Sequence, residues 1–210
     1  MADKWVWSPA ACAVLLTLVY LLQPKFYLPP PSEKRPAGPV LQLPHDDAEL
    51  KAVLALPNAQ KLTRCSMRWD FGFIGAYTLF FLAFALFQPR PWRVVMIVVT
   101  LAAAAFDVWE DVVILRFAAD ANHARASDVW FPAQAKWVCV FAAMLLGATL
   151  FARAGSWWGI AIAIALAVPS LVGIAASLAR SRALILLASR GLLLLIVAAF
   201  VLPRVVKRAG

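Results

Sequence analysis

The sequence predicts an all-α integral membrane protein whose six transmembrane helices form one bundle. Two observations support this fold class. Of the 210 residues, 63% are hydrophobic and only 15% are charged, whereas a soluble domain is about 45–50% apolar. The chain also contains six apolar runs that reach the roughly 20 residues with which a helix crosses about 30 Å of hydrocarbon. We therefore expect a single membrane domain over residues 1–210.

The first predicted span covers residues 6–22. Ser8 and Pro9 suit the cap and the first turn of a helix, and Trp5 and Trp7 suit the level of the lipid headgroups. A secretory signal peptide is the alternative, because it has an apolar core of similar length. No small-residue cleavage site follows Leu22, so we expect an uncleaved first span.

Residues 23–67 are predicted to form an extramembrane loop. The loop is rich in proline up to Pro44, which favours an extended linker. Asp46 and Asp47 then favour the start of a short amphipathic helix, and Pro57 separates it from a second short helix over residues 58–67. Two interpretations stay open: a helix on the bilayer surface, and a lid over a site in the bundle.

The other five spans are predicted at residues 69–87, 92–116, 129–151, 157–178 and 183–202. An even number of spans places both termini on one side of the membrane. Short connections on that side carry Arg90, Arg93 and Arg153, and the positive-inside rule then makes the termini cytoplasmic. The expected location is the inner membrane of a cell, with the long loop in the periplasm or outside the cell.

Composition and motifs argue against several functional classes. The net charge of +9 is spread over the ends of apolar segments rather than gathered with aromatic residues, so we expect no nucleic acid partner. Cys12, Cys65 and Cys139 form no CxxC pair, and His45 and His123 lie in polar connections, so no zinc or haem ligand set is assigned and the cofactor is unknown. The expected partner is the lipid bilayer with a bound lipid or amphiphile; a homo-oligomer or a partner membrane protein stays open.

The third predicted span contains the clearest candidate for a site. Asp107 lies three residues before Glu110 and four before Asp111, so the carboxylates share one face of a helix. A charge within a bilayer costs about 2.5–3.5 kcal/mol on insertion scales. These acids are therefore expected to face water, cations or a ligand rather than lipid.

Further polar residues are expected at the same level of the bundle. Asp70 begins the second span and Lys136 lies early in the fourth, while Arg190 is expected to lie as deep as Asp107 and to pair with the acids. Tyr77 is expected to line the cavity, and Trp109 is either a wall for a cationic ligand or a packing residue. The candidate set is Asp70, Tyr77, Asp107, Trp109, Glu110, Asp111, Arg116, Lys136 and Arg190.

Several functions are compatible with this set. Four acids against three cations leave a surplus carboxylate, which can bind a hard cation, accept a proton or hold a cationic headgroup. The preferred hypothesis is an outward-facing site that binds a lipid headgroup, another amphiphile or a cation. The alternatives are a small proton- or cation-coupled transporter, a metal-assisted lipid-headgroup enzyme, and a structural or assembly subunit whose buried charges only lock the helices. Whether the chain is an enzyme stays open.

Overall fold

The computed structural model describes residues 8–22 and 37–200, and every regular element within these ranges is a helix. The predicted linker at residues 23–36 lies outside the described residues. The elements are α1 (Ser8–Leu22), α2 (Ala37–Gln42), α3 (Asp47–Leu54), α4 (Ala59–Ala85), α5 (Arg90–Ala119), η2 (Ala121–His123), α6 (Ala126–Ala152), α7 (Trp157–Leu178), α8 (Arg182–Ser189) and α9 (Gly191–Ala199). The all-helical class predicted from the sequence is confirmed for the part of the chain that the structure describes.

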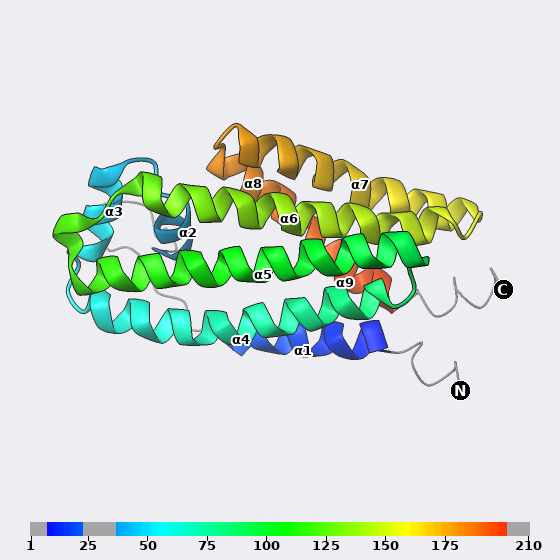
Figure 1. Ribbon diagram of the computed structural model, residues 1–210, viewed down its shortest axis with the longest axis horizontal. Helices are drawn as coiled ribbons and strands as arrows, with labels where there is room; N and C mark the ends of the chain where they lie inside the picture. Colours follow the sequence, from blue (N-terminus) through cyan, green and yellow to red (C-terminus); the bar gives the residue numbers. More distant parts are fainter. Residues whose placement is uncertain (1–7, 23–36, 201–210) are drawn as a thin grey trace.

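The long helices lie side by side along the longest axis of the molecule (Figure 1). Each of α4, α5, α6 and α7 packs against the next, α1 packs against α4, and α9 packs against α7 and α1. Helices α2 and α3 lie at one end of the bundle, where α5 ends and α6 begins (Figure 1). The start of α1 and the end of α9 lie at the opposite end.

Three of the described helical stretches are long and apolar enough to cross a membrane: α6, α7 and the stretch Arg182–Ala199. They indicate a membrane protein. Helix α1 is apolar but has only 15 described residues. Helices α4 and α5 are longer than α1, with 27 and 30 residues, but both carry several charged side chains and are not among these three stretches.

Helix α4 continues through the boundary that the sequence suggested between loop and span. The predicted short helix at residues 58–67 and the predicted span at residues 69–87 form one helix from Ala59 to Ala85. Asn58, with a left-handed φ of 63°, precedes its first turn. The segment from Ala59 to Trp69 contains no glycine or proline, so no residue in it favours a break.

The last predicted span consists of two consecutive helices, α8 and α9, with Arg190 between them. The backbone of Arg190 stays in the right-handed helical region (φ −62°, ψ −22°), so the interruption is local. Gly191 opens α9 directly against α7: a Cβ atom at this position would lie 2.8 Å from the ring of Pro169. The close approach of α7 and α9 therefore requires glycine here.

Helices α2 and α3 and their connection (residues 37–54) form a structure that we call the cap. Its apolar side chains pack on α4, α5 and α6 and are buried; they are Val40, Leu41, Leu50 and Val53. Polar contacts tie the cap to α6: the Trp130 indole N–H donates to the carbonyl of Pro44, and the Ala126 N–H donates to Asp47 at 2.6 Å. The cap is thus packed over one end of the bundle.

An ion pair ties the cap to α8. The Arg182 guanidinium donates to both carboxylate oxygens of Glu49 at 3.0 Å and to the carbonyl of Leu43 at 3.2 Å. Glu49 also belongs to the start of α3, because its N–H donates to the Asp46 carboxylate at 2.7 Å while its own carboxylate accepts from the His45 N–H. Asp46 thus caps the start of α3, and Glu49 reaches back to the residue before the cap.

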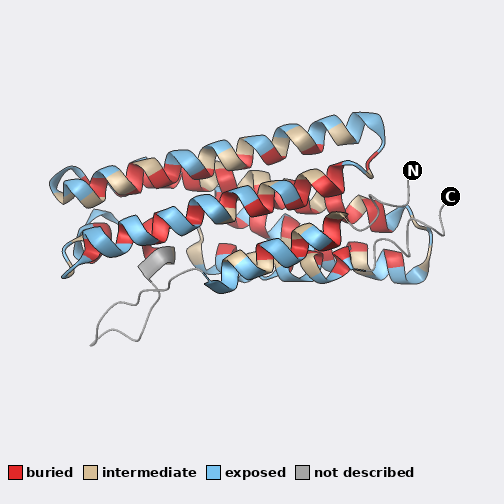
Figure 2. Ribbon diagram, turned by 90° about the horizontal axis from the view of Figure 1, so that it is seen from below, coloured by how far each residue is buried: buried red, intermediate tan, exposed pale blue. Residues whose placement is uncertain are grey.

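Buried residues follow the inner faces of the helices and exposed residues follow the outside (Figure 2). The main apolar core fills the bundle with large side chains such as Phe80, Phe84, Phe141 and Phe151. A second apolar cluster lies beneath the cap, around Ile114 and the buried residues of α3. The acids of α4 and α5 occupy positions between residues of these two clusters.

Candidate functional site

Four buried acids gather around one lysine inside the bundle. Asp70 comes from α4, the other three acids come from α5, and Lys136 comes from α6. Their exposed fractions are 6% for Asp70, 4% for Asp107 and Lys136, and 0% for Glu110 and Asp111. Neighbouring helices thus bring together residues that the sequence separates by up to 66 positions (136 − 70).

Lys136 binds two of the acids. Its Nζ lies 2.8 Å from Oδ1 of Asp107 and donates a hydrogen bond to it. The same Nζ lies 2.6 Å from Oε2 of Glu110, although the angles of this contact do not suit a hydrogen bond. The ammonium group also lies 5.5 Å from the centre of the Trp137 ring. Among the described residues, Lys136 is the cation that contacts the acids.

Two neutral groups donate hydrogen bonds to Asp107 and Asp70. The Tyr77 hydroxyl donates to Oδ2 of Asp107 at 3.0 Å, so both oxygens of Asp107 have a partner. Nε2 of Gln42, at the end of α2, donates to Oδ2 of Asp70 at 3.2 Å. The cap therefore contributes directly to the site. Gln42 was missed in the sequence, because a single amide in a proline-rich loop has no periodic spacing that relates it to α4.

Asp111 has neither a hydrogen bond nor an ion pair with a described residue, whereas Glu110, whose oxygens also accept no hydrogen bond, contacts Lys136. The Asp111 side chain is fully buried, and neither carboxylate oxygen has a hydrogen-bond partner. It faces the other acids: one carboxylate oxygen from each of Asp70, Asp107 and Asp111 lies within 4.8 Å of the other two. Oxygen donors at this spacing suit a hard cation, and a proton bound to one of these carboxylates would also reduce the repulsion between them.

Three predicted site residues lie outside this cluster. Trp109 is 48% exposed and contacts Phe106 and Phe131 on the outside of α5 and α6. Arg116 is exposed on α5. Arg190 is exposed as well, and no ion pair links it with a described acid.

The expected pairing of Arg190 with the acids is therefore not found. The buried residues around it, Ile185, Ala188, Gly191 and Leu195, recur at spacings of three and four. Arg190 falls outside this stripe, so the helix turns it away from the bundle. The position of a residue along a helix does not fix the direction in which its side chain points.

The site lies well inside the bundle. Asp111 precedes the end of α5 at Ala119 by eight residues and Asp107 precedes it by twelve, which is about 12 Å and 18 Å at 1.5 Å per residue. No protein-family model, curated protein or solved structure matches the chain. The function therefore has to be inferred from the chemistry of this site.

Proposed function

We propose that this chain is a polytopic inner-membrane protein with six spans, and that its buried acidic site binds a cation. Large apolar side chains on the outside of the bundle support the membrane part of the proposal. Val98 and Leu101 of α5 are 59% and 51% exposed, and Leu18 of α1 and Leu79 of α4 are 51% and 52% exposed. Surfaces of this kind suit lipid rather than water, so α1, α4 and α5 would lie in the bilayer beside α6, α7 and the α8–α9 stretch.

The observation that carries the cation proposal is the unpartnered carboxylate of Asp111. A buried charge without a partner costs about 3–5 kcal/mol. A cation bound to Asp111, with Asp70 and Asp107 as its neighbouring oxygen ligands, would offset this cost. Carboxylate oxygens are the ligands that Mg²⁺, Ca²⁺ and Mn²⁺ prefer, so a divalent ion of this class is the proposed ligand.

The remaining residues of the site would hold these carboxylates in place. Lys136 fixes Asp107 and Glu110, Tyr77 orients Asp107, and Gln42 contacts Asp70 from the cap. A lipid headgroup suits the site less well than an ion does. The acids would repel a phosphate, and carboxylate oxygens within 4.8 Å of one another favour a small ion over a bulky quaternary ammonium group.

Manganese binding tests the proposal, because Mn²⁺ accepts the same oxygen ligands and free Mn²⁺ is counted directly by electron paramagnetic resonance. The purified parent protein is expected to bind Mn²⁺ and to release it to excess Mg²⁺ or Ca²⁺. Asp111→Asn keeps the shape of the side chain and removes its charge, and it is expected to weaken Mn²⁺ binding by about tenfold or more.

Asp128→Asn is the matched control, because Asp128 is exposed near the start of α6. It is expected to bind Mn²⁺ as the parent does. Equal binding by the parent and Asp111→Asn would contradict the proposal. Absence of Mn²⁺ binding by the parent would also contradict it.

Proton binding is the second candidate function, and the same unpartnered Asp111 supports it. A proton on Asp111 would remove the unpaired charge without a metal ion. This would make the chain a proton-coupled transporter. Proton uptake after a pH jump, measured with a dye in liposomes, would then be lost in Asp111→Asn, and Mn²⁺ binding would be absent from both proteins.

A further inference from the structure

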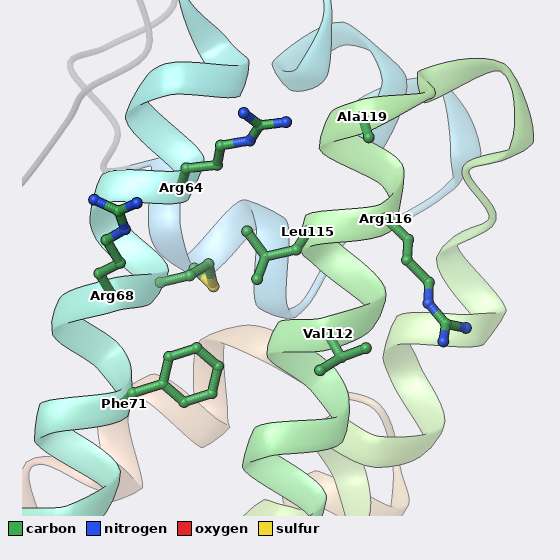
Figure 3. Close-up of a pocket in the computed structure, with 8 residues that line it drawn as sticks. Arg64, Arg68, Phe71, Val112, Leu115, Arg116 and Ala119 are labelled. Atoms are coloured by element: carbon green, nitrogen blue, oxygen red, sulfur yellow. The ribbon is translucent and has the colours of Figure 1, made fainter.

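A groove of about 640 Å³ lies on the outer surface between α4 and α5, separate from the acidic site (Figure 3). On α4, Arg64, Arg68 and Phe71 are spaced four and three residues apart, so they share one face of the helix. This face is exposed, whereas Asp70 points into the bundle. The lining residues are Arg64, Met67, Arg68, Phe71, Val112, Leu115, Arg116 and Ala119.

The groove combines a basic rim with an apolar floor. Arg64, Arg68 and Arg116 are all exposed, and none of them forms an ion pair with a described residue. Phe71 and Leu115 provide apolar surface between the two helices. The charge of the rim is therefore not neutralised by the described part of the chain.

The arrangement of the side chains gives the groove a direction. Figure 3 shows the Arg64 guanidinium reaching from α4 toward α5, whereas the side chains of Arg68 and Arg116 point away from the space between the helices, on opposite sides of it. Phe71 and Val112 lie below Arg64, further from the ends of the helices near the cap. Beyond them the outer faces of both helices stay apolar, with Leu79 52% and Val108 39% exposed.

We propose that this groove binds a phospholipid with an anionic headgroup. The phosphate would lie against Arg64. Arg68 and Arg116 would add positive potential, and an acyl chain would follow the apolar floor toward Leu79. Basic pockets between transmembrane helices on the cytoplasmic side of membranes bind acidic headgroups, and the same pairing of charges applies to this groove at the cap end of the bundle. A soluble anion would leave the apolar floor exposed to water, and a lipid without net charge would leave the rim charge unbalanced.

Native mass spectrometry of the full chain tests this proposal. The protein is released from micelles that contain equal amounts of phosphatidylglycerol and phosphatidylcholine. The parent is expected to retain phosphatidylglycerol in preference to phosphatidylcholine. The triple variant Arg64→Gln, Arg68→Gln, Arg116→Gln is expected to lose the preference, and Arg64→Gln alone is expected to weaken it about fivefold.

A matched triple variant separates the groove from general charge. Arg90→Gln, Arg125→Gln and Arg190→Gln remove the same charge from three exposed arginines elsewhere, and the preference for phosphatidylglycerol is expected to survive. Equal loss in both triple variants, or no preference in the parent, would overturn the proposal. If the groove triple does not fold, Arg64→Gln provides the same comparison with Arg125→Gln.

Inorganic phosphate distinguishes a lipid from a free anion. Excess inorganic phosphate is expected to leave the bound phosphatidylglycerol in place, and its displacement would show that the groove recognises a phosphate group alone, against the proposal. The lipid proposal is independent of the cation proposal. Loss of lipid in the groove triple is expected to leave Mn²⁺ binding unchanged, and loss of Mn²⁺ in Asp111→Asn is expected to leave lipid binding unchanged.

Discussion

Asp107 and Asp111 lie four residues apart on the same face of α5 but have opposite surroundings. Asp107 accepts hydrogen bonds from Tyr77 and Lys136, whereas the carboxylate of Asp111 accepts none. Each oxygen of Asp107 already accepts a hydrogen bond, whereas both oxygens of Asp111 accept none and have more capacity for a further ligand. This contrast makes Asp111 the principal ligand of the proposed cation, with Asp107, held in place by Tyr77 and Lys136, as a neighbouring ligand.

Lys136→Met is expected to destabilise the protein strongly. It leaves Asp107 and Glu110 buried without their cation, and breaking a buried ion pair in this way costs about 3–5 kcal/mol. For a chain of this size the melting temperature in detergent should fall by about 10 °C.

Lys61→Met is the control for this prediction, because Lys61 is exposed on α4. Its melting temperature is expected to stay close to that of the parent. If Lys136→Met had the same melting temperature as Lys61→Met, the buried ion pairs would have no role in stability.

At this scale, helical spacing in the sequence was sufficient to place the acids of α5 together, and Asp70, Tyr77 and Lys136 do join them in the structure. It was not sufficient for Trp109 or Arg190, because periodicity fixes relative direction only within one helix. Their rotation depends on which neighbouring helices bury the opposite face, and a single sequence does not contain this information.

Among the elements, the contact of α6 with α7 depends on a glycine. A Cβ atom on Gly173 would lie 2.4 Å from the ring of Phe141, which is fully buried. Gly173→Ala is therefore expected to destabilise the protein by about 1–3 kcal/mol, as overpacking of a core does. Thermal unfolding in detergent measures this effect.

Gly75→Ala is its control on α4, because a Cβ atom there would have no neighbour within 4 Å. Alanine favours a helix over glycine by about 1 kcal/mol, so this variant is expected to melt at or above the temperature of the parent. A Gly173→Ala protein as stable as Gly75→Ala would mean that α6 and α7 pack less closely than described.

The cap is the element in which one charge can be removed with little other change. Glu49→Gln keeps the hydrogen bond from the His45 N–H, because the amide oxygen of glutamine also accepts, but it removes the ion pair with Arg182. The pair is partly exposed, with 27% of each side chain accessible, so the expected loss is at most about 1 kcal/mol.

Hydrogen exchange measures which part of the chain loses stability in Glu49→Gln. Amides of residues 47–54 are expected to exchange several-fold faster in Glu49→Gln, while those of α5 and α6 stay as in the parent. Exchange that accelerates over the whole chain would instead indicate a global role for the ion pair.

Element boundaries followed the sequence where apolar runs end in strong breaks. Helix α7 matches the predicted span at residues 157–178, and α6 extends the predicted span at residues 129–151 by three residues at its start and one at its end. The interruption at Arg190 was not predicted, because it accompanies the packing of Gly191 on Pro169 of a different helix. The sequence also did not predict the continuity of α4. Charged residues such as Arg64 and Arg68 mark the end of an apolar run, but arginine is a good helix former and does not interrupt the helix.

At the scale of the whole molecule, the two ends of the bundle differ in composition. The end opposite the cap carries Arg90 and Arg93 at the start of α5 and Arg153 directly after α6, and these residues support our proposal that the termini are cytoplasmic. Cys65 lies near the cap end of α4 and is exposed, whereas Cys12 and Cys139 are partly buried. A membrane-impermeant maleimide is therefore expected to label Cys65 from the outer face of intact spheroplasts.

Cys65→Ser is expected to abolish this labelling. In inverted vesicles the maleimide reaches only the cytoplasmic face, so Cys65 is expected to stay unlabelled there. Labelling of Cys65 in inverted vesicles alone would place the cap in the cytoplasm and reverse the proposed topology.

The ion pair between Glu49 and Arg182 also bears on the order in which the protein is assembled. The two residues are 133 positions apart, so at a synthesis rate of about 5–20 residues per second Glu49 waits about 7–27 s for its partner. By then Asp70, Asp111 and Lys136 have all been made. The ribosome thus completes the acids and Lys136 of the site before it supplies Arg182, which follows Lys136 by 46 positions (182 − 136). A cation therefore has about 2–9 s in which to reach the acids before the arginine that fastens the cap is made.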